Sequence, residues 1–382
     1  MQRKFIVLAI AGAMAGLTAG SAIAADASSA PSVSFYGVLD YGFLNRGGNG
    51  GAVTTEGSSQ NALNSGISAG SRLGVKGGKE LANGTKFLYE IEYGVTLDNN
   101  GGGSNSTSTT PSSPFWNRHS YIGVTGDSGT FVGGRLEGAR FSFSNAYDPF
   151  AGGTVGNFGS LLGHQARADN AVAYISPSFA GGFSVLAAYT ARLTGGELPG
   201  DNGDARLYAI APQYNNGPLS VTYDYEDATV HGTGGDIKIN VLGGSYDFTV
   251  IKLFAYWESV KASGALAGLN LDQKAYLLGA TAPVSEAAKL KVSYGNVKDG
   301  YAVNNNCTKA SVGVDYSLDK SFNIYSDFAS ISNQSNASCT IATSSASYSG
   351  SHASFAGVDS TIPGNTSGYG TRGFDLGVKY KF

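Results

Sequence analysis

The chain has 382 residues, of which 56 are glycine, 22 tyrosine and 19 phenylalanine, and its formal net charge is −3. Charged residues make up only 14% of it, so the chain lacks the basic surplus that is typical of nucleic-acid-binding proteins. Many glycines and aromatic residues with few charges favour a β protein whose strands alternate between polar and apolar residues.

The first segment predicts a secretory signal peptide. A basic start with Arg3 and Lys4 precedes an apolar run over residues 5–17, and small residues suited to cleavage follow. The run is shorter than the about 20 residues that a membrane-spanning helix needs. We therefore expect residues 1–24 to be removed and residues 25–382 to form the folded protein.

Alternation of apolar and polar residues then recurs along the chain, which is typical of strands with one apolar face. Sixteen such segments are predicted, at residues 32–44, 67–78, 85–97, 115–126, 130–136, 170–176, 183–192, 204–214, 219–228, 236–247, 250–260, 271–284, 289–298, 308–318, 322–331 and 371–382. Most are about ten residues long, which suffices to cross a bilayer at a tilt.

The connections between these segments alternate in length. Every second one is short, such as "DSG" and "NNGP", whereas the others are longer, notably residues 45–66, 137–169 and 332–370. An antiparallel meander with this alternation places every long loop at the same end, as in outer-membrane barrels. A β-sandwich with Greek-key connections would not sort its loops in this way. Aromatic residues beside the short connections, including Phe179 and Tyr246, suit the lipid headgroup level.

The last segment, "GFDLGVKYKF", shows which environments the two faces meet. Its apolar side includes Phe374 and Leu376, and its polar side includes Asp375 and Lys379. We expect the apolar side to face lipid and the polar side to face a wet lumen. Because no strand edge can stay unpaired in lipid, the last strand must pair with the first. The sequence thus predicts an all-β, 16-stranded antiparallel transmembrane β-barrel.

Longer motifs extend this interpretation to a family. The stretches "SVSFYGVLDYG", "SRLGVKGGKELANGTKFLYEIEYG", "FWNRHSYIGVTGDSGTFVGGR", "NAVAYISPSFAGGFSVLAAY" and the terminal "GVKYKF" resemble the general porins of Gram-negative outer membranes, most closely the trimeric betaproteobacterial type. The resemblance implies a homotrimer in the outer membrane, in contact with lipid and lipopolysaccharide. It implies a water-filled channel for passive diffusion of ions and small hydrophilic solutes, without enzymatic activity, cofactor, metal or nucleic-acid partner. It also implies that the barrel-assembly machinery recognises the terminal aromatic residues Tyr380 and Phe382.

In this family the third long loop folds inward and narrows the pore, with arginines facing it from the wall. By position, the loop corresponds here to residues 137–169. The resemblance and the positions of the charges give a set of candidate residues for this constriction: Arg72, Arg118, Arg135, Arg140, Arg167, Glu137 and Asp148. Opposed charges across a narrow lumen select solutes. Because the nearest charges are mostly positive, we expect a weak preference for anions.

Two placements near this site conflict with simple alternation. Arg118 shares its parity with Ile122 and Val124, which would then also point into the lumen. Either a β-bulge or burial of this strand in the trimer interface would remove the conflict. His119 has the opposite parity, so we expect it to face away from the lumen.

Two other classes of function stay open. A substrate-specific channel or an adhesin could use the same barrel. An outer-membrane hydrolase would need His, Ser and acidic groups arranged for nucleophilic catalysis. The chain has four histidines, of which His164 lies in the predicted inward loop near several serines, but serine is too abundant for this proximity to indicate catalysis.

The two cysteines, Cys307 and Cys339, fall in consecutive long connections. The two strands between these connections are neighbours, so the loops begin about 5 Å apart. An exported chain passes through an oxidising compartment. We therefore expect a disulfide that pins the last long loop and that the barrel itself does not need.

Overall fold

The structure is a computed structural model that describes residues 31–48, 59–81, 84–98, 115–162, 164, 166–193, 205–230, 234–264, 272–300, 305–337, 339–343 and 370–382. The expected signal peptide and much of the first, second and last long loops lie outside these residues. The strands are β1 (Ser32–Gly47), β2 (Gln60–Ser65), β3 (Arg72–Glu80), β4 (Lys86–Val95), β5 (Phe115–Gly126), β6 (Gly129–Glu137), β7 (Arg167–Ile175), β8 (Phe183–Thr190), β9 (Ala205–Asn216), β10 (Leu219–Val230), β11 (Gly235–Asp247), β12 (Lys252–Gly264), β13 (Asp272–Pro283), β14 (Ala288–Asp299), β15 (Cys307–Ser317), β16 (Phe322–Asn333) and β17 (Arg372–Lys381).

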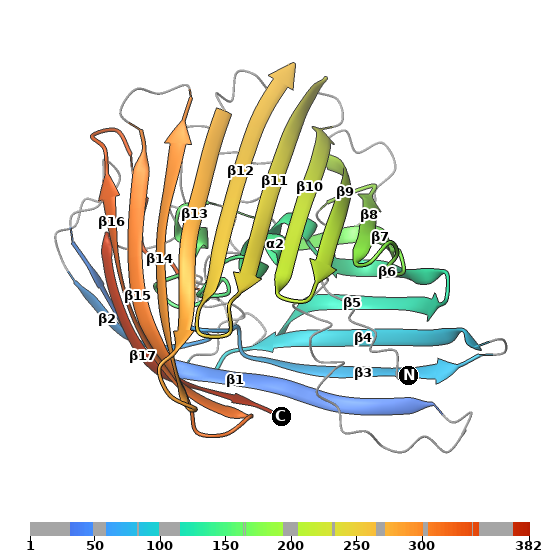
Figure 1. Cartoon of the computed structure of the whole chain (residues 1–382), viewed down its shortest axis with the longest axis horizontal. Coiled ribbons are helices and arrows are strands. Elements are labelled where there is room, and N and C mark those ends of the chain that lie inside the picture. Colours follow the sequence, from blue (N-terminus) through green and yellow to red (C-terminus); the bar gives the residue numbers. More distant parts are fainter. Residues whose placement is uncertain are drawn as a thin grey trace.

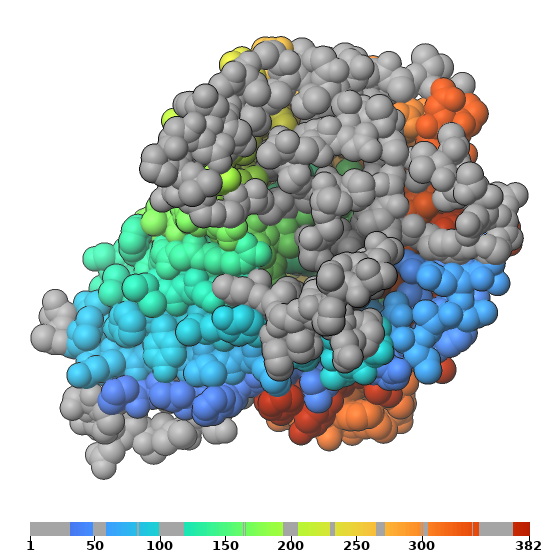
Figure 2. All heavy atoms as spheres, turned by 180° about the vertical axis from the view of Figure 1, so that it is seen from behind, coloured from blue at the N-terminus to red at the C-terminus, as the bar shows by residue number. Residues whose placement is uncertain are grey.

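Antiparallel pairing closes these strands into a barrel (Figure 1). From β3 onward each strand pairs with the next, and β17 returns to pair with β1, from Val38 opposite Lys381 to Gly47 opposite Arg372. The red C-terminal strands lie beside the blue N-terminal ones in the view from behind as well (Figure 2). Strands β2 and β3 both pair with β1, one with each half of it, and so occupy a single position. The 17 strands therefore fill sixteen positions, which confirms the predicted barrel.

The two faces of each strand meet different environments, as the alternation predicts. On β17 the side chains of Phe374, Leu376 and Val378 are 38%, 49% and 40% exposed on the outer face, whereas Asp375 is buried on the inner face. Aromatic rings gather at the end of the barrel that carries the short connections, which we call the short-turn end. Phe183 and Tyr214 lie 4.7 Å apart between ring centroids there. An outer apolar face with aromatic rings at its border matches a surface that meets lipid.

A segment that folds into the barrel interior, described at residues 138–162, 164 and 166, is what we call the third loop. It contains the helix α2 (Ala139–Ala146) and the short 3-10 helix η3 (Phe158–Ser160), and α2 is seen within the barrel in Figure 1. Within the described ranges, no helix has the length and hydropathy needed to cross a membrane.

Glycines on the inner wall make room for the third loop. A Cβ atom at Gly243 would lie 2.1 Å from the Tyr147 ring, and one at Gly295 would lie 2.7 Å from the Phe158 ring. Any larger residue would collide with the loop at these two positions. Part of the glycine enrichment of the sequence thus serves loop packing.

Two expectations about the connections need correction. Residues 60–65, expected in the first long loop, form β2, whose polar composition gives no apolar alternation. The β10–β11 connection, residues 231–234, is shorter than the β7–β8 connection, residues 176–182, so the lengths do not separate as cleanly as the sequence predicts. The cause is that β10 and β11 both extend beyond their expected ends.

Candidate functional site

Four arginines lie together on the wall beside the base of the third loop, and we call them the arginine cluster: Arg72, Arg118, Arg135 and Arg167. They come from β3, β5, β6 and β7, and β4 lies between the first two of these strands. Glu92 on β4 joins two of them, because Arg72 Nε lies 3.1 Å and Arg118 Nε 2.5 Å from its carboxylate oxygens.

The other two arginines of the cluster are paired at the base of the third loop. Arg135 forms an ion pair with Asp169, and its Nε donates to the carbonyl oxygen of Arg118 at 3.2 Å. Arg167 Nη1 lies 3.2 Å from Glu137 Oε1. The four guanidinium groups of the cluster thus pair with the carboxylates of Glu92, Glu137 and Asp169.

A β-bulge brings Arg118 into this cluster. His119 lies opposite Glu92, and Asn117 lies opposite Tyr93, so Arg118 is the extra residue on β5. An extra residue changes the parity of the strand on either side of it. Ile122 and Val124 accordingly stay on the outer face, where they are 60% and 41% exposed. Of the two explanations that the sequence leaves open, the structure shows the bulge.

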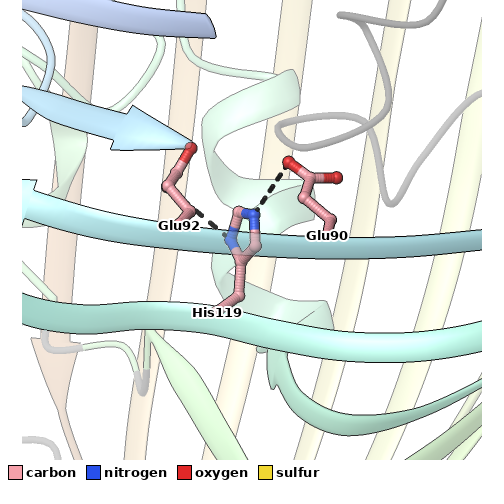
Figure 3. A group of neighbouring side chains, drawn as sticks. All are labelled: Glu90, Glu92 and His119. Atoms are coloured by element: carbon pink, nitrogen blue, oxygen red, sulfur yellow. Dashed lines mark hydrogen bonds and ion pairs between the residues drawn. The ribbon is translucent and has the colours of Figure 1, made fainter. Parts of the chain in front are cut away.

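Because the extra residue is Arg118, His119 keeps the parity of Tyr121 and also faces inward, so the expectation that His119 faces away from the lumen is wrong. Its side chain is buried between Glu90 and Glu92, which reach opposite sides of the ring (Figure 3). His119 Nε2 lies 3.1 Å from Glu90 Oε1, and Nδ1 lies 3.7 Å from Glu92 Oε1. The hydroxyl of Tyr121 also donates to Glu90, at 2.7 Å.

Glu90, Glu92 and His119 are residue types that can ligate a metal ion, and their donor atoms lie within 4.8 Å of one another. Their arrangement, however, favours an electrostatic network. The two carboxylates approach different ring nitrogens, and a single ion can bind only one nitrogen of the ring. Glu92 is moreover already paired with Arg72 and Arg118. The network thus holds those two guanidinium groups in place on the wall.

Arg140 and Asp148, also predicted at the constriction, are buried residues of the third loop itself. Arg140 Nε donates to Glu258 Oε2 at 2.8 Å, and the Arg140 backbone N donates to Glu226 Oε1 at 3.0 Å. Burial alone would lower the pKa of Arg140, but Glu258 raises it above its usual value. The structure therefore places Arg140 as an anchor of α2 to β10 and β12.

Asp148 folds the third loop on itself. Its carboxylate accepts hydrogen bonds from the backbone N of Phe150 at 3.0 Å and of Phe158 at 2.8 Å. Burial raises the pKa of Asp148 above its usual value. The side chain is 4% exposed. The sequence-based prediction that Asp148 forms the opposing face of an open lumen is therefore wrong.

A second anchor involves His164, the histidine that the hydrolase alternative depends on. Its Nδ1 lies 3.1 Å from Ser144 Oγ and its Nε2 lies 3.2 Å from Glu258 Oε2. This order of groups resembles a catalytic triad, but all three side chains are buried, whereas a nucleophile must meet its substrate. Burial, together with the nearby Arg140 charge, lowers the pKa of His164. The three groups tie the loop to the wall.

The two cysteines are joined by a disulfide, as the sequence predicts, with a sulfur–sulfur distance of 2.04 Å. Cys307 begins β15, and Cys339 follows β16 at the end of the barrel that carries the long loops. Both residues are fully buried.

Comparisons with known proteins agree with this geometry. The model of the family described as Gram-negative porin matches residues 9–336. Outer membrane porin protein 32 of Delftia acidovorans is 26% identical over 350 residues, which cover 87% of this chain and 90% of that protein. An outer membrane porin protein of Bordetella pertussis is 30% identical over 263 residues, 63% of this chain and 66% of that protein.

Solved structures share the fold. The anion-selective porin from Comamonas acidovorans matches with a TM-score of 0.69 and 22% identity, over 92% of this chain and 100% of that one. The trimer form of OmpT from Vibrio cholerae matches with a TM-score of 0.62 and 17% identity, over 92% of this chain and 100% of that one.

Proposed function

Because the chain belongs to the Gram-negative porin family, we propose that the arginine cluster and the third loop form the constriction of its channel and give that channel a preference for small anions. The protein is an outer-membrane channel for the passive diffusion of ions and small hydrophilic solutes, as its family, its relatives and its barrel show. The proposal concerns which residues set the selectivity of that diffusion.

Unequal exposure of the two charge signs carries the proposal. The side chains of Arg72 and Arg118 are each 20% exposed, whereas their shared partner Glu92 is 4% exposed. Arg135 is 32% exposed and its partner Asp169 is 19% exposed. At these three arginines a solute in the lumen meets the guanidinium groups first, whereas Arg167 and Glu137 are equally exposed, at 8% each. Charges beside a narrow, partly desolvated path are screened by salt much less than charges on an open surface.

The third loop supplies the narrowing. Its buried anchors to the wall, at Arg140 and His164, fix its position across the lumen and leave its base beside Arg167 and Glu137. A fixed narrow passage excludes large solutes, and its wall charges then select among small ones. The structural neighbour from Comamonas acidovorans is titled anion-selective, which agrees with this proposal, although that likeness shows the fold alone.

Reversal potentials of single channels in a salt gradient test the proposal. We expect the wild-type channel to prefer anions, and Arg118→Ala and Arg135→Ala each to shift the reversal potential toward cations, with a larger shift in the double variant. Lys261→Ala is the matched control, because Lys261 is 63% exposed and lies 3.9 Å from Asp272, away from the cluster. A shift in the control without a shift in the arginine variants would contradict the proposed location of the constriction.

We propose further that the chain assembles as a homotrimer in contact with lipid and lipopolysaccharide, and that the barrel-assembly machinery recognises its last residues. A trimer form among the solved neighbours supports the first part. For the second part, Phe382 closes the barrel through backbone hydrogen bonds with Gly37 of 3.0 and 3.2 Å, and its ring stacks 5.8 Å from that of Tyr380. Cross-linking of the protein in native membranes tests both interactions.

A further inference from the structure

The last long loop contributes a second inward-folded element. After β16 the chain turns back into the barrel, and Ala337 and residues 339–343, which we call the inner segment, are each at most 2% exposed. Ile341 and Cys339 belong to the same apolar cluster as Val155 and Phe158 of the third loop. The sequence gives no sign of this burial, because the stretch is short and rich in small residues.

The inner segment is bonded directly to the far half of the third loop. Asn157 Nδ2 donates to the carbonyl oxygen of Ala342 at 2.7 Å. Ser160 Oγ lies 3.2 Å from the backbone N of Ala342 and 3.3 Å from its carbonyl oxygen. Both partners flank or belong to η3, so this part of the loop rests on the inner segment.

The other side of the inner segment contacts the wall. The Ile341 backbone N donates to the carbonyl oxygen of Gly370 at 2.9 Å, and Arg46 Nη1 on β1 donates to the Ile341 carbonyl oxygen at 3.4 Å. On β17, a Cβ atom at Gly373 would lie 2.8 Å from the Ile341 side chain and 2.9 Å from that of Val155. The inner segment is therefore packed between the wall and the third loop, at a place where the wall has no side chain.

The disulfide is the covalent attachment of the inner segment. It links Cys339 to Cys307 on β15, and Asn333 Nδ2 adds a hydrogen bond to the Cys339 carbonyl oxygen at 2.9 Å. The third loop has wall contacts of its own in this half, since Lys309 Nζ donates to the Asn157 carbonyl oxygen at 2.5 Å. Loss of the inner segment would thus loosen this half of the loop without releasing it.

From these contacts we propose that the inner segment, held by the Cys307–Cys339 disulfide, is a second determinant of channel width. It supports the far half of the third loop and occupies lumen space that a free loop would leave open. The size limit of the channel then depends on a covalent bond that lies outside the arginine cluster.

The double variant Cys307→Ser with Cys339→Ser tests this proposal in planar bilayers and in liposome swelling with sugars of increasing size. Because conductance follows the cross-section of the narrowest passage, we expect it to rise by roughly 1.5-fold or more. Larger sugars should also enter, while the barrel keeps its heat-resistant fold. Conductance and sugar limit equal to the wild type would overturn the proposal, as would a narrower channel.

A second variant reaches the same contact with the disulfide intact. Asn157→Ala with Ile341→Ala removes the bond and the packing between the two loops, and we expect the same direction of change in conductance and sugar limit. The matched control is Thr125→Ala with Thr130→Ala, a hydroxyl pair 2.7 Å apart on β5 and β6 near the short-turn end, which should leave both unchanged. If the double-serine variant fails to assemble, the Asn157 and Ile341 variant decides, and an unchanged channel then overturns the proposal.

Discussion

Replacing Arg140 with methionine should release α2 from the wall. Arg140 and Glu258 form an ion pair whose side chains are 9% and 1% exposed. Methionine keeps most of the apolar stem but leaves Glu258 buried without its guanidinium partner, beside Glu226. Breaking a buried pair by removing one partner costs about 3–5 kcal/mol. Tyr256 Oη still donates to Glu258 at 2.5 Å, so the lower end of that range applies here.

A cost of about 3 kcal/mol raises the population of the detached loop by roughly two powers of ten, since each 1.4 kcal/mol is a factor of ten. Single-channel recordings should then show frequent changes of conductance where the wild type is steady. Adding Glu258→Met removes the unpaired buried charge, and removing both charges is often close to neutral for buried pairs. Because Glu258 is also the wall partner of His164, the double variant should restore only part of the steadiness of the wild-type channel. Steady currents in Arg140→Met would refute the role of this ion pair as the anchor.

Three further perturbations follow from individual contacts. Asp40→Ala removes a carboxylate that accepts hydrogen bonds from backbone N–H groups between β2 and β3 and from Tyr325 Oη at 2.8 Å. Leaving these buried donors unpaired costs about 1–3 kcal/mol each, so the unfolding temperature of the barrel should fall. An unchanged unfolding temperature would contradict a stabilising role for these hydrogen bonds. Deletion of Phe382 should reduce the amount of heat-resistant barrel in the outer membrane more than the conductance of any assembled channel, and normal assembly would count against an assembly signal. Burial and Arg140 lower the pKa of His164. Neutral His164 therefore stabilises the folded loop at pH values above the ordinary histidine pKa, and this contribution is lost as the pH falls through the lowered pKa. Proteolysis of the loop should increase in acid, and His164→Asn should remove that increase.

Period-two alternation was sufficient to predict the barrel. The alternation arises because one face of every strand meets lipid and the other meets the lumen. The limits of single strands could therefore be predicted as well, and β17 begins and ends within one residue of its expected limits. The disulfide was predictable for a related reason, because the order of the strands brings Cys307 and Cys339 to neighbouring loops.

Placements that depend on single backbone irregularities or on distant contacts were not predictable from the alternation. One extra residue at Arg118 lets Arg118 and His119 both face inward, whereas simple alternation allows only one of them to do so. Asp148 is the right residue type for a pore wall, but backbone N–H groups within its own loop bind it instead. The burial of Ile341 depends on the absence of a side chain at Gly373, which lies on β17, far from Ile341 in the sequence.

The central claim is that a lumen surface with exposed guanidinium groups sets the selectivity of this channel. The most direct test is the reversal potential of the purified protein in a planar bilayer under a salt gradient, with the double variant Arg118→Ala and Arg135→Ala measured beside it. The account predicts discrete channels with an anion preference that the double variant weakens or reverses. A cation preference in the wild type, or the same reversal potential in both proteins, would contradict it.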